Sequence, residues 1–329
     1  MEKIKKITIA APTYGNLPRV NFWIQSVWNN LEPGPEVDLD ILVVDDGTPD
    51  KQVVENRSRY CGKFNVNFAA NERNLGIPGA WNRIFRWAEN HGSDLVLCCN
   101  DDVRFLAPGW LARILYVFNN NDAIGGVGLP LVNEGGLKMD DPRWDGEPGR
   151  VGAAIGCVFA MRPEVLFKVE NPDGKNGFWE SLRAFHEEVH AGFSLARLGY
   201  YSLMLPWPPL RHMGGATFQA NQELIWMDLP DYLTKEEFLS YVRSLPWYVK
   251  GYEENYQKGR FDRMSMSRCM FTKYWGILGM ERMQEIPGQG MVDIWAEPQK
   301  WVHSQVVTPM PPKELKWLDR NGTQRVTVI

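Results

Sequence analysis

Two adjacent carboxylates stand directly behind an apolar run in the first third of the chain. Residues 94–99 lack helical spacing and predict a buried strand, and Asn100, Asp101 and Asp102 follow it. Open α/β sheets bind their ligands at the carboxyl ends of such strands. Because two neighbouring acids repel each other, a hard divalent cation with a bound diphosphate would compensate for their charges. A solvated Asn-Asp-Asp turn is the ordinary alternative.

Two further acidic pairs and one histidine are candidates for chemistry. Asp45 and Asp46 follow another apolar run and precede a glycine, which is also common turn chemistry. Glu187 and Glu188 open a predicted helix, where the helix dipole stabilises negative charge with or without a function. A carboxylate there would serve as the general base for a reacting hydroxyl group. His212 taken alone is more often a structural histidine with satisfied hydrogen bonds than a metal ligand.

A competing pattern, His-Glu-x-x-His, begins at His186. It is the signature of zinc metallopeptidases, in which His186 and His190 would bind the metal and Glu187 would be the general base. A third ligand such as His212 or Glu223 would be required, and no metzincin continuation follows. This hypothesis leaves the N-terminal half unexplained. Two helix-surface histidines are the ordinary interpretation.

Composition and charge narrow the class of protein. The 329 residues carry a formal net charge of -4 and a pI near 5.8, so general nucleic-acid binding is not indicated. Five cysteines, an odd number with two of them adjacent, favour a reduced, cytoplasmic protein. We expect neither a signal peptide nor a membrane span, because no long uncharged apolar segment occurs.

The first third of the chain alternates between strand and helix patterns. Strands are predicted at residues 7–11 (stopped by Pro12), 39–44, 64–68 and 94–99. Helical spacing of apolar residues predicts helices that begin near Pro18 and Gly79, and another that passes through Trp110. Strands that alternate with helices imply a parallel, doubly wound sheet.

From about Gly125 the pattern changes. Further strands are predicted at residues 125–131, 153–161 and 200–205, together with a helix over 187–198. A capping box at 234–237 opens another helix, and the Pro-rich chain after Ile286 is expected to be an arm or wrapped tail. These changes divide the chain into a nucleotide-binding half, an acceptor half and a C-terminal extension, at 1–105, 106–218 and 219–329.

The order of several motifs resembles family 2 glycosyltransferases. The motifs are Pro12-Thr13-Tyr14, the segment 44–48, Asn74-Leu75-Gly76 with Asn82, and Asn100-Asp101-Asp102 at the place of the family's Asp-x-Asp. Residues 185–189 resemble the family's Glu-Asp helix start, with Glu in place of Asp, and 206–215 resembles the segment with a late metal-binding His. The resemblance covers about residues 6–218. It implies an α/β fold of GT-A type, Rossmann-like and doubly wound with a mostly parallel sheet, followed by a partly helical C-terminal extension.

The resemblance also implies roles for individual residues. Asp102 and His212 would hold Mn²⁺ or Mg²⁺, Glu188 would be the catalytic base with Glu187 close behind, and Asp46 would accept from the nucleotide base. The expected donor-binding residues are Pro12, Thr13, Tyr14, Asp46, Asn74, Gly76, Asn82, Asn100 and Asp101.

We therefore expect a metal-dependent, inverting glycosyltransferase. Its donor would be a nucleotide-diphosphate sugar, with a UDP-sugar as the default, and its acceptor a hydroxyl group on a glycan, a protein or a modified nucleobase in DNA. The alternatives are the zinc metallopeptidase and a sugar-nucleotide-binding protein without catalysis.

Overall fold

The structure is a computed structural model that carries no ligand. It describes residues 3–15, 19–32, 37–133, 145–151, 157–183, 186–208, 210–213, 226–230, 233–244, 255–256, 258–275, 283–286, 290–293 and 314–327.

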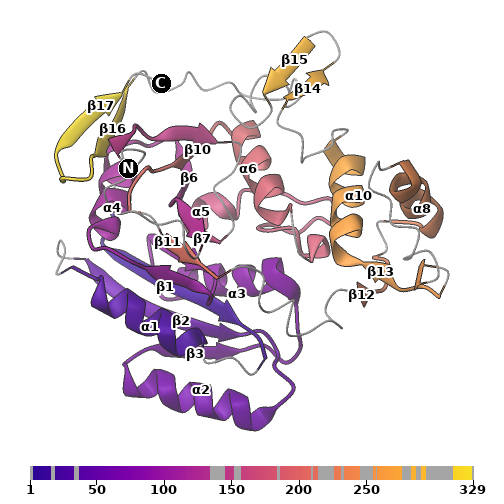
Figure 1. Ribbon diagram of the computed structural model, residues 1–329, viewed down its shortest axis with the longest axis horizontal. Helices are drawn as coiled ribbons and strands as arrows, with labels where there is room; N and C mark the ends of the chain where they lie inside the picture. The colour runs from indigo at the N-terminus through magenta and orange to yellow at the C-terminus, as the bar shows by residue number, and fades with distance from the viewer. Residues whose placement is uncertain are drawn as a thin grey trace.

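A twisted, mostly parallel sheet forms the centre of the molecule (Figure 1). Its strands, in spatial order, are β3 (Asn67–Ala70), β2 (Asp38–Asp45), β1 (Lys6–Thr13), β4 (Leu95–Cys99), β9 (Val158–Met161), β6 (Ile124–Gly128), β10 (Tyr201–Met204) and β8 (Gly149–Val151). The first four strands are parallel, as are β6 and β10, whereas β9 and β8 run antiparallel to their neighbours. The doubly wound α/β architecture expected from the sequence is therefore confirmed.

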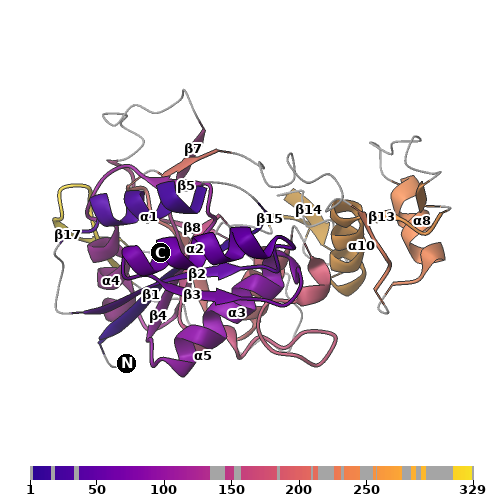
Figure 2. The same ribbon diagram turned by 90° about the horizontal axis from the view of Figure 1, so that it is seen from below.

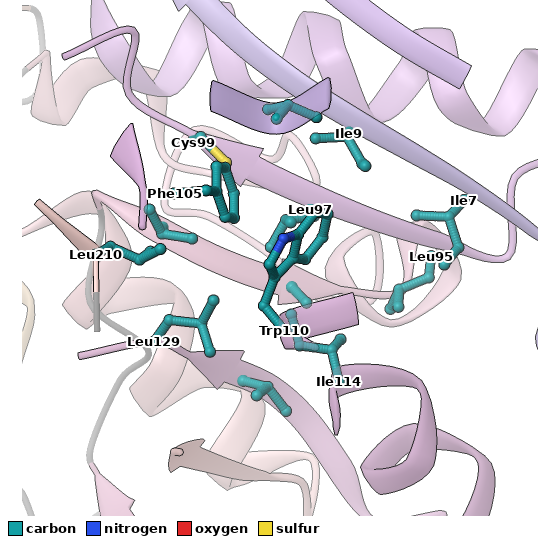
Figure 3. Packing of buried hydrophobic residues seen from close by; sticks show 14 of the residues in the cluster. Ile7, Ile9, Leu95, Leu97, Cys99, Phe105, Trp110, Ile114, Leu129 and Leu210 are labelled. Atoms are coloured by element: carbon teal, nitrogen blue, oxygen red, sulfur yellow. The ribbon is translucent and has the colours of Figure 1, made fainter. Parts of the chain in front are cut away.

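Apolar side chains on both faces of the sheet explain why helices cover both. Ile7 and Ile9 of β1 belong to one core with α1 (Arg19–Asn29) and α4 (Trp110–Asn120), and α2 (Lys51–Lys63) adds Cys61 to it. Ala10 points to the opposite core, which contains α3 (Gly76–Asn90), α5 (Pro163–Leu166) and α6 (Glu187–Arg197). Figure 3 shows Trp110 of α4 packed close to Leu97 of β4 in the first core. Period-two alternation thus divides each central strand between two helical layers.

Several predicted strand limits are wrong. The strand predicted at 125–131 ends at Gly128, and the next strand begins only at Leu131. Strand β1 continues through Pro12 to Thr13, because pairing with β4 has already ended at Ala10 and the absent proline N–H is not required. The third strand begins at Asn67 rather than at Phe64, which instead caps α2 and stacks on Tyr60 at a centroid distance of 4.8 Å.

A small second sheet lies beyond the carboxyl end of β4. It consists of β5 (Val103–Phe105), β11 (Leu210–His212) and β7 (Leu131–Asn133), with β11 in the middle. Strand β11 pairs antiparallel with β5 and parallel with β7. This sheet joins segments that are far apart in the sequence.

The C-terminal region forms a third core beside the main sheet (Figures 1 and 2). Helices α8 (Lys235–Ser244) and α10 (Arg263–Trp275) and the strand pair β12 (Trp226–Met227) and β13 (Phe261–Asp262) belong to this region. The predicted capping box is confirmed: Thr234 N donates to Glu237 Oε2 at 2.9 Å, and Glu237 N donates to Thr234 Oγ1 at 3.2 Å. The buried side chains of Trp179 and Leu182 join this core, so the extension packs on the main domain.

Two hairpins complete the described chain. They are β14 (Met283–Ile286) with β15 (Gly290–Asp293), and β16 (Leu315–Leu318) with β17 (Gln324–Thr327). The second hairpin packs on α4, where Arg113 donates to the Asp319 carbonyl at 2.9 Å and Asn121 donates to the Lys316 carbonyl at 3.0 Å. The C-terminal segment therefore wraps back onto the first core.

Candidate active site

The acidic pair lies at the carboxyl end of β4, as the sequence predicted. Asn100 N donates to the Cys157 carbonyl at 2.8 Å, and Val103 N donates to the Asn100 carbonyl at 3.2 Å, so the chain turns immediately after the strand. The buried Asp101 accepts a hydrogen bond from Thr13 Oγ1 at 2.8 Å. Burial raises the pKa of Asp101 to about 6, while this hydrogen bond lowers it. Asp101 therefore fixes the end of β1 to the end of β4.

The small sheet brings His212 to Asp102. His212 of β11 is the register partner of Val103, and Met213 N donates to the Asp102 carbonyl at 3.1 Å. As a result His212 Nε2 lies 3.3 Å from Asp102 Oδ1. The same ring nitrogen lies 3.5 Å from the Cys157 thiol. The expected metal pair is thus assembled from two segments distant in sequence.

The contacts of Asp102 are compatible with a divalent cation. Its Oδ1 atom is buried and, among the residues that the structure describes, accepts no hydrogen bond of acceptable geometry. Two neighbouring ligands of an octahedral Mg²⁺-sized ion lie roughly 3 Å apart, which is close to the separation of Asp102 Oδ1 and His212 Nε2. Within the described parts of the chain, no group of three or more His, Cys, Asp and Glu side chains is arranged to hold a metal.

The protonation of His212 is coupled to this site. The neighbouring Asp102 carboxylate, followed by the Cys157 thiol, raises the pKa of His212 to about 10, against the effect of burial. The imidazolium form therefore predominates at neutral pH when no metal is bound. A metal ion would have to displace that proton.

Two arginines lie next to the acidic pair. Arg19, in the first turn of α1, approaches Asp102 with Nη1 3.8 Å from Oδ2. This Nη1 atom is buried and donates no hydrogen bond to any other described residue. Arg104 is held differently, since its Nη1 donates to the carbonyls of Asp101 at 3.0 Å and Val103 at 2.8 Å. Nη1 of Arg19 therefore has no hydrogen-bond acceptor among the described residues.

The acids at the end of β2 have separate roles. The fully buried Asp45 pairs with Arg57 of α2 and accepts from Thr48 N at 2.8 Å, so its carboxylate is committed to the fold. Asp46 accepts from Asn71 Nδ2 at 2.9 Å, Leu75 N at 3.0 Å and Gly76 N at 3.1 Å.

Among the described residues, one hydrogen-bond acceptor position of the Asp46 carboxylate is not used. Its Oδ1 accepts two of the three hydrogen bonds and Oδ2 only one, and a carboxylate oxygen can accept two. Burial raises the pKa of Asp46 to about 6, against the three hydrogen bonds that lower it. Asp46 therefore organises the segment before α3 and retains one site for a ligand donor.

That segment depends on a glycine. Gly76 has a φ of +78°, and a Cβ atom added there would lie 2.8 Å from the Arg183 carbonyl oxygen. Asn74 Oδ1 accepts from Gly76 N at 3.1 Å, and Arg183 Nη1 donates to the Leu75 carbonyl at 2.6 Å. The predicted donor-binding residues Asn74 and Gly76 thus lie in one turn with Asp46.

Asn82 is placed differently from the other predicted donor residues. Its amide oxygen accepts from Phe178 N at 2.8 Å, and its amide nitrogen donates to the Phe178 carbonyl at 2.8 Å and to Glu180 Oε1 at 3.1 Å. Both amide hydrogens are therefore used to hold the loop that leads to the 3₁₀ helix η2 (Glu180–Leu182). Pro12 and the half-buried Tyr14 lie at the end of β1, at the same edge of the sheet as Asp46.

Glu187 and Glu188 form the first turn of α6, as predicted. The Oε2 atoms of both are buried, and neither forms a hydrogen bond within the described part of the chain. Burial, followed by the charge of Glu188, raises the pKa of Glu187 well above its usual range, and burial raises that of Glu188. A carboxyl group with a raised pKa suits general-base chemistry near neutral pH.

The contacts of His190 argue against a zinc peptidase site. Its Nδ1 accepts from Trp275 Nε1 at 3.1 Å, and its Nε2 lies 3.0 Å from Asn171 Oδ1. Both ring nitrogens are therefore occupied, and burial lowers the pKa of His190 to about 3. His186 precedes α6 with a φ of +69° and is buried. The interpretation of both as helix-surface histidines is wrong as well, because aromatic rings of α10 pack on each.

The sequence analysis missed Arg19 and Cys157. Arg19 carried a usable signal, since a cation in the first turn of a helix opposes the helix dipole and implies a nearby negative charge. Cys157 had no comparable signal, because it meets His212 only through the pairing of β11 with β5 and the turn after β4.

The match to a known family covers the N-terminal half of the chain. Residues 8–166 match glycosyl transferase family 2. A sequence search of curated proteins gives no match. Within the described residues, no helix combines the length and apolarity required to cross a membrane.

Solved structures resemble this chain at low sequence identity. GalNAc-T7, solved with UDP, GalNAc and Mn²⁺, superposes with a TM-score of 0.52 and 15% identity over 78% of this chain and 55% of that chain. The mannosyltransferase PcManGT of Pyrobaculum calidifontis, solved with GDP-Man and Mn²⁺, has a TM-score of 0.47 and 16% identity over 78% and 69%. Residues 1–349 of S. aureus TarS give 0.48 and 14% over 83% and 72%. The chain thus spans about half the length of GalNAc-T7.

Proposed function

We propose that the chain, whose residues 8–166 match glycosyl transferase family 2, is a metal-dependent transferase that uses a nucleotide-diphosphate sugar. The observation that carries the metal dependence is the pair Asp102 and His212, 3.3 Å apart at the carboxyl end of β4. GalNAc-T7, which shares the fold, was solved with UDP and Mn²⁺, and this supports UDP-sugars and Mn²⁺ as the first donor and cation to test.

Each group of the site has a proposed task. A divalent cation, Mn²⁺ or Mg²⁺, would stabilise the departing diphosphate as a Lewis acid, and Asp102 and His212 would hold it. Asp46 would accept a hydrogen bond from the nucleotide base with the open position on Oδ2. The turn of Asn74 and Gly76 would shape the pocket beside it.

Glu188 is the proposed catalytic base. It would take the proton of the acceptor hydroxyl as that oxygen attacks the anomeric carbon, which inverts the configuration of the sugar. Glu187, the more deeply buried of the two, is the second candidate. The acceptor class is a hydroxyl group on a glycan, a protein or a modified nucleobase.

Hydrolysis of nucleotide sugars in the absence of an acceptor tests the proposal. The chain is incubated with UDP- and GDP-sugars with and without Mn²⁺, beside Asp102→Ala and the control Asp145→Ala. The control removes an exposed carboxylate whose described partner is Arg320, at 3.1 Å. We expect Mn²⁺-dependent release of nucleoside diphosphate by the wild type and the control, but not by Asp102→Ala. Near-normal turnover of Asp102→Ala in Mn²⁺ would refute the metal assignment.

A sugar-nucleotide-binding protein without catalysis gives a different result in the same assay. It would bind the donor in Mn²⁺ and release no nucleoside diphosphate. The two buried carboxyl groups that open α6 favour the enzyme, since such groups have no purpose in nucleotide binding alone.

A further inference from the structure

Arg19 and Asp102 are two buried opposite charges that do not satisfy each other. Nη1 of Arg19 lies 3.8 Å from Oδ2 of Asp102, which is beyond hydrogen-bond distance. The two side chains are only 15% and 8% exposed. Within the described residues Arg19 Nη1 donates no hydrogen bond, whereas Asp102 Oδ1 faces His212 Nε2 at 3.3 Å. A buried donor without an acceptor is costly, and a ligand with acceptor oxygens would remove that cost.

The position of Arg19 adds to this cost. It occupies the first turn of α1, where the helix dipole is positive, and that turn contains no acidic residue. Arg104 already lies beside the same acids. A second arginine beside these acids is therefore favourable when a further negative group, such as a ligand anion, binds there.

We infer that Arg19 and the divalent cation share Asp102 in alternation, and that the arrival of the cation releases the Arg19 guanidinium to bind the diphosphate of the donor. This inference rests on the proposed function and adds a residue and an order of events to it. In the metal-free state the Asp102 carboxylate attracts Arg19, and a bound cation would neutralise that carboxylate. The planar guanidinium then offers its N–H groups to phosphate oxygens, for which its fork geometry is suited. Arg19 Nη1 then has an acceptor.

Two consequences of opposite sign follow from this arrangement. Without nucleotide, Arg19 opposes the cation, so removal of its charge should tighten Mn²⁺ binding. With Mn²⁺ present, Arg19 binds the diphosphate, so removal should weaken UDP binding. A residue that only supports the fold would weaken both.

The experiment compares the full-length wild type with Arg19→Gln, Arg19→Lys and Arg86→Gln. Arg86 lies over the Phe167 ring at 4.7 Å and provides the same loss of charge away from the acidic pair. Free Mn²⁺ is measured by electron paramagnetic resonance, and the binding of UDP and of uridine by calorimetry in saturating Mn²⁺.

For Arg19→Gln we expect Mn²⁺ alone to bind about tenfold more tightly, the effect of removing one charge about 6 Å from a divalent ion in a polar medium. UDP should bind about 10- to 100-fold more weakly, as for a lost charge-assisted hydrogen bond, and uridine should bind as before. The UDP affinity of Arg19→Lys should lie between those of the wild type and Arg19→Gln, because lysine keeps the charge without the planar fork. Arg86→Gln should match the wild type.

Unchanged UDP affinity in Arg19→Gln, or an equal loss for UDP and uridine, would overturn the inference while leaving the proposed function intact. Mn²⁺ affinity that falls together with UDP affinity would assign Arg19 to the fold alone and would also overturn it. A wild type that binds neither UDP nor GDP in Mn²⁺ would refute the proposed function and this inference together.

Discussion

Metal binding to this site should be strongly dependent on pH, because His212 must lose a proton first. The Asp102 carboxylate and the Cys157 thiol raise the pKa of His212 to about 10, so the ring is an imidazolium throughout the neutral range. Each rise of one pH unit below that value increases the neutral fraction about tenfold. The apparent affinity for Mn²⁺ should therefore increase about 100-fold between pH 6.5 and pH 8.5.

Calorimetry measures both the affinity and the displaced proton. Titration of Mn²⁺ at one pH in two buffers of different ionisation enthalpy should show about one proton released per ion. Cys157→Ala removes the second of the two groups that raise the pKa of His212, so its Mn²⁺ affinity at pH 7 should exceed that of the wild type. A Mn²⁺ affinity that is constant over this range, with no proton released, would show that His212 does not bind the ion.

Rising pH, which favours metal binding, should lower the stability of the metal-free fold. A histidine whose pKa is raised in the folded state stabilises that state fully below its unfolded pKa of about 6.5. This contribution is lost as the pH rises toward 10. The metal-free protein should therefore lose stability with rising pH, under the conditions in which Mn²⁺ binds best.

Four other substitutions, with Gly62→Ala as a control, test the remaining parts of the site. Glu188→Gln should lower turnover by about 10²–10⁴-fold in steady-state assays with donor and metal affinity preserved, and Glu187→Gln should be milder; the reverse order would move the base to Glu187. Asp46→Ala should weaken UDP binding in calorimetry by about 1–3 kcal/mol through a lost charge-assisted hydrogen bond, and equal affinity would remove Asp46 from the nucleotide site. Gly76→Ala should lower the free energy of unfolding in urea by about 1–3 kcal/mol, because φ is +78° and the added Cβ meets a carbonyl oxygen, whereas Gly62→Ala in α2 has open space and should not destabilise.

The sequence predicted the features that depend on residues close together in the chain. The strand-helix alternation, the acids behind β4 and the acidic first turn of α6 all depend on residues close together in the chain. The pairing of Asp102 with His212 could be expected only from the family resemblance, since it is created by the three-residue strands β5 and β11, which are too short to show a period. The commitment of Asn82 to Phe178 depends on a loop contact across the fold and has no sequence signature.

The proposed pH and metal dependence of the site likewise rests on tertiary contacts. Cys157 and Arg19 are ordinary residues in the sequence, and their effects on His212 and Asp102 arise only after folding. The histidine pattern that begins at His186 shows the opposite case. The local motif is complete, but both ring nitrogens of His190 contact other side chains, Asn171 and Trp275, and are therefore not available to a zinc ion.

The contact between Trp275 and His190 links the C-terminal region to helix α6. Trp275 is the last residue of α10, and His190 lies one turn after the two acids on α6. Arg197 of the same helix also lies over the Trp275 ring at 4.1 Å. Because burial holds His190 neutral, with a pKa of about 3, acidity within the physiological range does not break this link. A fragment that ends before α10 would lose it, so α6 and α10 should be expressed, engineered and exchanged as one unit.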